Sequence, residues 1–308
     1  MITTVLLAAW LAAPGTSSPC DGAESQLKSA AEAFAKHDLA AAARILEPLE
    51  SGYRACWRVT LALGTLRYEQ GDYRHANTYS ELALLAAPDE PQALLLRAQL
   101  LSMQNQGPQA RQLLEKAVKL APNNAEAHYQ LGTLLDGIRR NKEAVAEFET
   151  VIRLRPNDAR AYDYLALNLE PLGEIQKAEA AYEKALPLNQ GPFADPFLDY
   201  NYGRLLFKLN RLTESKQHLD RAVQLAPQAR AVYYEHARLN LRLDHLAEAR
   251  ADAERAASIA DPGGFILDLQ VYNLLVQICT RQGDQEAAQK YARLCETAQV
   301  PIKMRERK

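Results

Sequence analysis

Residues 122–156 read PNNAEAHYQLGTLLDGIRRNKEAVAEFETVIRLRP, and this stretch decides the fold. Leu131 and Leu135 in its first half and Phe148 in its second half belong to amphipathic runs of helical spacing. Asn124 is suited to cap the helix that begins after Pro122, and a second proline closes the stretch. The segment therefore predicts two antiparallel helices joined by a short turn.

The same pattern recurs along the chain with a period of about 34 residues, and a fixed period of this length is the signature of a repeat protein. Pro88, Pro122 and Pro156 are equally spaced, and each follows the end of an amphipathic run. A small residue recurs in the first half of each unit, at Ala30, Gly64, Ala98, Gly132, Ala166, Gly203 and Ala237. A second small residue follows twelve positions after the first, at Ala42, Ala76, Ala110, Ala144, Ala178, Ser215 and Ala249, with Ala288 in the last unit.

Close packing explains why these positions are small. Where two antiparallel helices cross, a side chain larger than alanine pushes their axes beyond the usual separation of about 8–10 Å. The interval between successive units is constant except before units six and eight, so insertions occur near Pro192 and near Pro262. The residues at which helices begin also follow the rule for N-caps, as at Asp158 and Asp195.

With Tyr129, Leu131-Gly132, Ala144, Phe148 and Pro156, the quoted unit resembles a tetratricopeptide repeat. The resemblance extends over about residues 23–302. It implies an all-α, right-handed α-solenoid of about eight helix pairs, in which the first helix of each pair, helix A, lines the inner, concave wall. We expect residues 23–190 to hold units one to five and residues 191–302 to hold units six to eight. Residues 303–308 form a basic tail.

Residues 1–22 differ from the repeats. Residues 2–13 are apolar and uncharged, and a short stretch of small and turn-forming residues follows. This arrangement is typical of a secretory signal peptide and is too short to span a bilayer. We expect export, to the periplasm or the extracellular space; a retained N-terminal helix is the alternative and would leave the protein in the cytoplasm.

Four cysteines, Cys20, Cys56, Cys279 and Cys295, show no spacing typical of a metal site. Cys20 precedes the first helix A and Cys56 begins the second, and neighbouring helix A starts lie close together in a stack. In an exported protein we expect a Cys20–Cys56 disulfide. Free thiols, or a lipid on Cys20, remain alternatives.

The resemblance also indicates which positions of helix A face inward. In units four and five these are mostly acidic or polar, namely Glu126, Tyr129, Thr133, Asp136, Asp163 and Glu170. In units six and seven they are aromatic or basic, and we expect them to bind a partner: Phe197, Tyr200, Arg204, Phe207, Lys208, Tyr234, Arg238 and Arg242. Arginine can grip a carboxylate with two hydrogen bonds, so we expect a protein or peptide partner with an acidic segment. The alternative is that the rings fill the seam between units and the cations are solvated.

No sequence motif for catalysis, cofactor binding or a metal is present. Lysine and arginine total 36 against 38 acidic residues, and the formal net charge of −2 gives no reason to expect nucleic acid as the partner. We therefore expect a protein-binding scaffold that is not an enzyme and has no cofactor. The alternative is a noncatalytic subunit or targeting module of a larger assembly.

Overall fold

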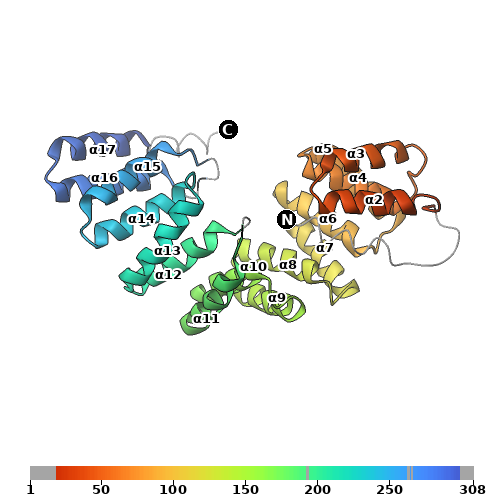
Figure 1. Ribbon diagram of the computed structural model, residues 1–308, viewed down its shortest axis with the longest axis horizontal. Coiled ribbons are helices and arrows are strands. Elements are labelled where there is room, and N and C mark those ends of the chain that lie inside the picture. Colours follow the sequence, from red (N-terminus) through yellow and green to blue (C-terminus); the bar gives the residue numbers. More distant parts are fainter. Residues whose placement is uncertain (1–18, 192–193, 262–263, 265, 299–308) are drawn as a thin grey trace. The chain divides into compact units, whose positions relative to one another are not determined.

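The computed structural model describes residues 19–191, 194–261, 264 and 266–298. The predicted signal peptide lies outside these residues except for its last four, and the basic tail lies outside them entirely. In the described part of the chain all regular structure is helical, and sixteen α-helices follow one another without a strand (Figure 1). They form eight consecutive pairs, which confirms the predicted fold class.

The chain divides into two compact units, residues 1–175 and 176–308. The helices of the first unit are α2 (Glu24–Ala35), α3 (Leu39–Leu46), α4 (Trp57–Glu69), α5 (Tyr73–Ala86), α6 (Pro91–Met103), α7 (Gly107–Leu120), α8 (Ala125–Gly137), α9 (Asn141–Leu154) and α10 (Ala159–Leu169). From Ile175 onward follow α11 (Ile175–Ala185), α12 (Pro196–Lys208), α13 (Leu212–Leu225), α14 (Arg230–Arg242), α15 (Leu246–Ser258), α16 (Asp268–Gln282) and α17 (Gln285–Ala298). The division after residue 190, expected from the sequence, remains a prediction.

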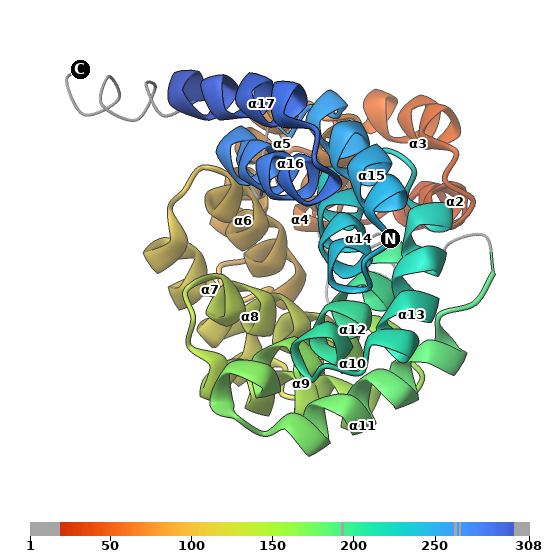
Figure 2. The same ribbon diagram turned by 90° about the vertical axis from the view of Figure 1, so that its left-hand side faces the viewer.

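Within each unit most helices pack mainly against their partner in the pair and then against the neighbouring pair, whereas α10 packs mainly against α9. Within the second unit α12 contacts α13 and α14, and α14 contacts α15 and α16 (Figure 2). The helices with even numbers are the A helices of their pairs, and within each unit successive A helices contact one another. The core is built from successive pairs, as a repeat protein requires.

The small residues lie where the helices cross. Gly132 of α8 faces the ring of Phe148 in α9, and a Cβ there would lie 2.9 Å from the ring. In the sixth pair Ser215 Oγ donates a hydrogen bond of 2.8 Å to the carbonyl oxygen of Gly203, twelve residues earlier. The recurring small residues at both positions are buried.

Caps at the helix starts agree with the sequence analysis. The Asn124 side chain accepts hydrogen bonds from the backbone N–H groups of Glu126 and Ala127. Asp158 and Asp195 cap α10 and α12 in the same way. Asn189, which is buried, accepts a hydrogen bond from Asp195 N–H and donates one to its carbonyl oxygen, and so closes the first insertion in front of α12.

Candidate functional site

The residues predicted to bind a partner lie on two neighbouring A helices of the second unit. On each helix an aromatic residue is followed, at steps of four residues, by two cations. We call these six residues the α12–α14 stripe: Tyr200, Arg204 and Lys208 on α12, and Tyr234, Arg238 and Arg242 on α14. Corresponding residues of the two helices hold the same register position, so two consecutive repeats present the same chemistry at the same places.

Arg238 of the stripe is held by several contacts. Its Cζ lies 5.1 Å from the ring centroid of Phe207 and 5.8 Å from that of Tyr234. Its Nη1 donates hydrogen bonds of 2.8 Å to both carboxylate oxygens of Glu235, which is buried. The guanidinium is therefore oriented by cation–π contacts and its charge is compensated inside the protein.

Tyr200 is half-buried and lies among charged neighbours. Burial, reinforced by the charge of Glu235, raises the pKa of Tyr200 to about 12. Its hydroxyl is therefore protonated at neutral pH and can act as a hydrogen-bond donor. Phe197, 44% exposed, packs edge-on against Tyr200 at a centroid distance of 6.0 Å.

The outer cations of the stripe are exposed at the C-terminal ends of their helices. Lys208 ends α12 and Arg242 ends α14, where Arg242 Nη2 lies 3.4 Å from the Asn210 side-chain oxygen. Arg281 of α16 follows Arg242 by the longer interval that separates units seven and eight, so it occupies the equivalent place. The sequence analysis missed Arg281 because it read the basic positions only in units six and seven; extending the register across the second insertion would have found it.

Two of the four inward acidic residues of the first unit, Glu126 and Asp163, are buried, and Asp136 and Glu170 are half-buried. Glu126 of α8 is 2% exposed, accepts a hydrogen bond of 3.2 Å from Gln130 and lies 3.6 Å from Arg155. Burial raises the pKa of Glu126, against the opposing effects of Gln130 and Arg155. Asp163 is also buried. These two carboxylates belong to the packing of their unit rather than to an open surface.

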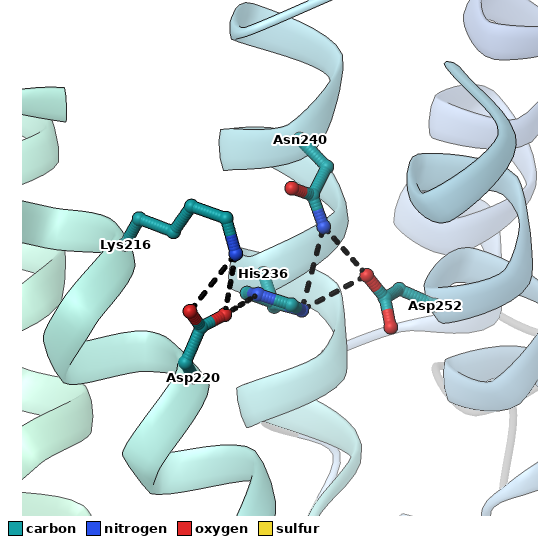
Figure 3. Close-up of polar contacts among 5 residues, drawn as sticks. All are labelled: Lys216, Asp220, His236, Asn240 and Asp252. Carbon is teal, nitrogen blue, oxygen red and sulfur yellow. Dashed lines mark hydrogen bonds and ion pairs between the residues drawn. The ribbon is translucent and has the colours of Figure 1, made fainter. Parts of the chain in front are cut away.

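A charged network on the other side of α14 was not found from the sequence. His236 lies between two carboxylates, with Nε2 2.8 Å from Asp220 of α13 and Nδ1 2.9 Å from Asp252 of α15 (Figure 3). Lys216 donates hydrogen bonds to Asp220, and Asn240 donates one to Asp252. Burial alone would lower the pKa of His236, but Asp252 and Asp220 outweigh it and the pKa is raised. The network ties three consecutive helices together.

Two further histidine–carboxylate pairs occupy one register position. His128 of α8 contacts Glu147 of α9, and Asp199 of α12 contacts His218 of α13. The two partners are 19 residues apart in both pairs, and His128 and Asp199 hold the same place in units four and six. The histidine is on helix A in unit four and on helix B in unit six, and the carboxylate is on the other helix in each case. A residue-by-residue comparison of the repeats could have revealed this exchange. The hydrogen bond with Glu147 raises the pKa of His128.

Cys20 and Cys56 form a disulfide in the structure. Both residues are buried, and Cys56 is also the N-cap of α4. Cys279 and Cys295 are free and buried. Among the residues described, no cluster of side chains suits a metal ion. None of the described helices has the length and apolar character that a membrane span requires.

No curated protein matches the chain significantly. Several solved structures share its fold. One is a chain of the APC/C hetero-tetramer Cut9-Hcn1, with a TM-score of 0.69, 18% identity and coverage of 82% of this chain and 48% of that one. A second is a tetratricopeptide repeat protein from Parabacteroides merdae, with a TM-score of 0.60, 18% identity and coverage of 83% and 98%. A third is PilW, a type IV pilus biogenesis factor, with a TM-score of 0.60, 19% identity and coverage of 67% and 92%.

Three family models described as tetratricopeptide repeat match the sequence. They match residues 101–167, residues 61–125 and 200–265, and residues 159–191 and 269–299. Together they cover well over half of the chain. The repeats and the fold are those of a protein-interaction scaffold in the general sense. The chain belongs to the tetratricopeptide repeat family.

Proposed function

We propose that this chain is an exported, noncatalytic scaffold that binds an acidic protein segment on the inner face of α12 and α14. The observation that carries the proposal is the α12–α14 stripe, in which two consecutive repeats place an aromatic residue and two cations at the same positions. Repetition of one chemistry at one register on adjacent helices suits a ligand that runs across the repeats.

The contacts within the stripe support an acidic ligand. Arg238 is oriented by Phe207 and Tyr234 and paired with Glu235, so it offers a partner a preordered surface for packing, and the ligand's carboxylates are left to the other cations. Lys208 and Arg242 are exposed at the helix ends, where a carboxylate can reach them. The formal net charge of the whole chain is −2, so the attraction for an acidic segment is local.

Export is supported by the N-terminal region. The Cys20–Cys56 disulfide is a feature of oxidising compartments, and an apolar segment of signal-peptide type precedes it in the sequence.

The test is affinity purification of the tagged, full-length protein from its native cell, with quantification of the proteins that accompany it. The variant is Lys208→Glu with Arg242→Glu, since both residues are exposed. Reversal of Arg238 is less suitable because it would place a second carboxylate beside the buried Glu235. The matched control is Lys290→Glu with Arg293→Glu, two exposed cations of α17.

We expect one set of companions to be lost from the α12/α14 variant and kept by the α17 control. If both variants retain every companion, the proposed site is wrong. Companions that stay in constant ratio to all forms of the chain would instead favour a structural subunit of a larger assembly.

A further inference from the structure

We propose that the first unit carries a second binding site, a pocket between its third and fourth helix pairs that takes an uncharged peptide segment with one aliphatic side chain. This inference goes beyond the proposed function. It concerns different helices from the α12–α14 stripe, so either site can fail its test without the other. It follows from the side chains that line the pocket and from the polar groups among them that have no partner.

The pocket lies where α8 contacts both α6 and α7 (Figure 2). It has a volume of about 530 Å³, which is in the range of pockets that enclose small ligands. Of the described residues that line it, none is charged. A charged group would lose hydration there without gaining an opposite charge, so the part of a ligand that enters the pocket is uncharged.

Several polar groups of the lining are available to a ligand. Within the described part of the chain, the side-chain amides of Gln99 and Asn105 make no hydrogen bond. The hydroxyls of Ser102 and Thr133 donate to backbone carbonyl oxygens of their own helices, so they can only accept from a ligand. A peptide backbone matches this set, because its N–H groups donate to the hydroxyls and its carbonyl oxygens accept from the amides.

Tyr129 adds a buried donor to the lining. This residue is 8% exposed, and its hydroxyl has no hydrogen-bond partner among the described residues, although buried polar groups are normally paired. Burial raises the pKa of Tyr129, so the hydroxyl is protonated at neutral pH. An acceptor from a ligand, such as a peptide carbonyl oxygen, would satisfy it.

The apolar part of the lining includes three aliphatic side chains. Leu114 of α7 is buried, Leu134 of α8 is half-buried, and Ile138, one helical turn later, is 50% exposed. An aliphatic side chain that covers Ile138 removes apolar surface of both partners from water. The pocket therefore favours a leucine, isoleucine or valine in the peptide, flanked by uncharged residues.

A neutral sugar has similar hydrogen-bonding groups but fits this lining less well. Sugar rings stack on the open face of an aromatic side chain, and Tyr129 is the only aromatic residue among the described residues that line the pocket. Its ring packs against Phe148 and Tyr164 and is covered by Arg160. A neutral glycan is therefore an alternative outcome of the test.

Two positions allow variants that leave the core intact. Ile138→Glu places a charge at the pocket, and Ile138→Gln places an uncharged side chain of the same size there. Asn105 has a left-handed backbone with φ of 59°, which glycine adopts freely, so Asn105→Gly removes the amide and keeps the turn. The matched control is Leu172→Glu, because Leu172 is 44% exposed, lies one repeat interval after Ile138 and does not line the pocket.

The experiment selects a phage library of short random peptides on the immobilised full chain. Wild type, Ile138→Glu and Leu172→Glu are used in parallel, and the enriched peptides are sequenced. The affinities of the most enriched peptides are then measured by fluorescence anisotropy for these three proteins and for Ile138→Gln and Asn105→Gly. The same proteins are applied to an array of neutral glycans, and circular dichroism verifies that each variant is folded.

We expect wild type and Leu172→Glu, but not Ile138→Glu, to enrich uncharged peptides that contain leucine, isoleucine or valine. Ile138→Glu should weaken their binding about tenfold or more, and Ile138→Gln should weaken it less. Asn105→Gly should weaken it about two- to tenfold, which corresponds to one hydrogen bond.

Three results would overturn the proposal. The first is that wild type enriches no uncharged peptide, and the second is that Ile138→Glu binds the enriched peptides as tightly as wild type does. The third is binding of a neutral glycan that Ile138→Glu loses while no uncharged peptide is enriched, which would replace the peptide by a sugar as the ligand.

Discussion

At Gly132 the fold leaves no room for a side chain. A Cβ at this position would lie between 2.9 and 3.1 Å from three atoms of the Phe148 ring, and Phe148 is fully buried. We expect Gly132→Ala to destabilise the protein by about 1–2 kcal/mol, because overpacking costs roughly 1–3 kcal/mol and the better helix propensity of alanine returns up to about 1 kcal/mol. Urea unfolding followed by circular dichroism measures this.

Gly137 provides the matched control on the same helix. It is exposed at the end of α8, and a Cβ there meets nothing within 4 Å. Gly137→Ala should leave stability unchanged or raise it by up to about 1 kcal/mol. Equal destabilisation by both substitutions would show that the close approach to Phe148 is not the cause.

The His236 network makes stability depend on pH. The pKa of His236 in the folded state is above its ordinary value of 6.5. Its contribution to the free energy of unfolding is therefore complete below pH about 6.5 and is lost as the pH rises through the folded-state pKa. We expect the difference in urea midpoint between wild type and His236→Gln to shrink between pH about 6 and pH about 8.

Asp220 changes the same network at low pH. Burial, the largest single effect, would raise the pKa of Asp220. Lys216 and His236 together outweigh it, so the pKa is lowered. The contribution of Asp220 to the free energy of unfolding is present above its ordinary pKa of 3.8 and is lost as the pH falls through the lowered pKa.

The control for His236→Gln is His245→Gln, at an exposed histidine between α14 and α15. Parallel pH profiles for wild type and His236→Gln would refute the role of the network.

At the scale of the element, the sequence predicted those features that are determined by residues close together in the chain. The helix pairs, the small residues at their crossings and the caps at Asn124, Asp158 and Asp195 were all predicted. The left-handed backbone of turn residues other than glycine, such as His37 and Arg139, was not predicted. The packing of the two helices that these residues join imposes this conformation.

Side-chain pairing between helices was the other part that the sequence did not reveal. His236 contacts Asp220 and Asp252, which lie 16 residues before and after it on two other helices. The constant repeat interval fixes which helices are neighbours but not which side chains meet. The repeat register predicted that the stripe residues lie on α12 and α14, but it could not predict that Arg238 donates hydrogen bonds to Glu235.

The disulfide joins elements of the first two pairs, because Cys20 precedes α2 and Cys56 begins α4. The two cysteines are 36 residues apart, and closing a loop of this size stabilises a fold by about 3–4 kcal/mol in the chain-entropy model. We expect reduction to speed amide hydrogen exchange in residues 24–69 while exchange in α14–α17 is unaffected. The Cys20→Ser/Cys56→Ser variant is the control, and reductant should not change it further. An unchanged exchange pattern in the reduced wild type would contradict the prediction.

At the scale of the whole molecule, the question is where the two units divide. The turns of the sequence favour a division after residue 190, whereas the packing groups α11 with the helices that follow it. The rings of Tyr182 in α11 and Tyr202 in α12 stack at a centroid distance of 5.1 Å, and both residues are buried. A fragment that starts at residue 191 lacks Tyr182 and exposes Tyr202.

We therefore expect residues 176–308 to form a more stable fragment than residues 191–308. The latter keeps three helix pairs, about the minimum for a stable repeat array, but loses the ring contact and the burial of Tyr202. Removing one large aromatic neighbour should cost about 2–3 kcal/mol. Urea midpoints of the two fragments measure the difference, and Tyr182→Ala in the longer fragment should reproduce most of it. Equal midpoints for the two fragments would place the division after residue 190, because α11 would then contribute nothing to the second unit.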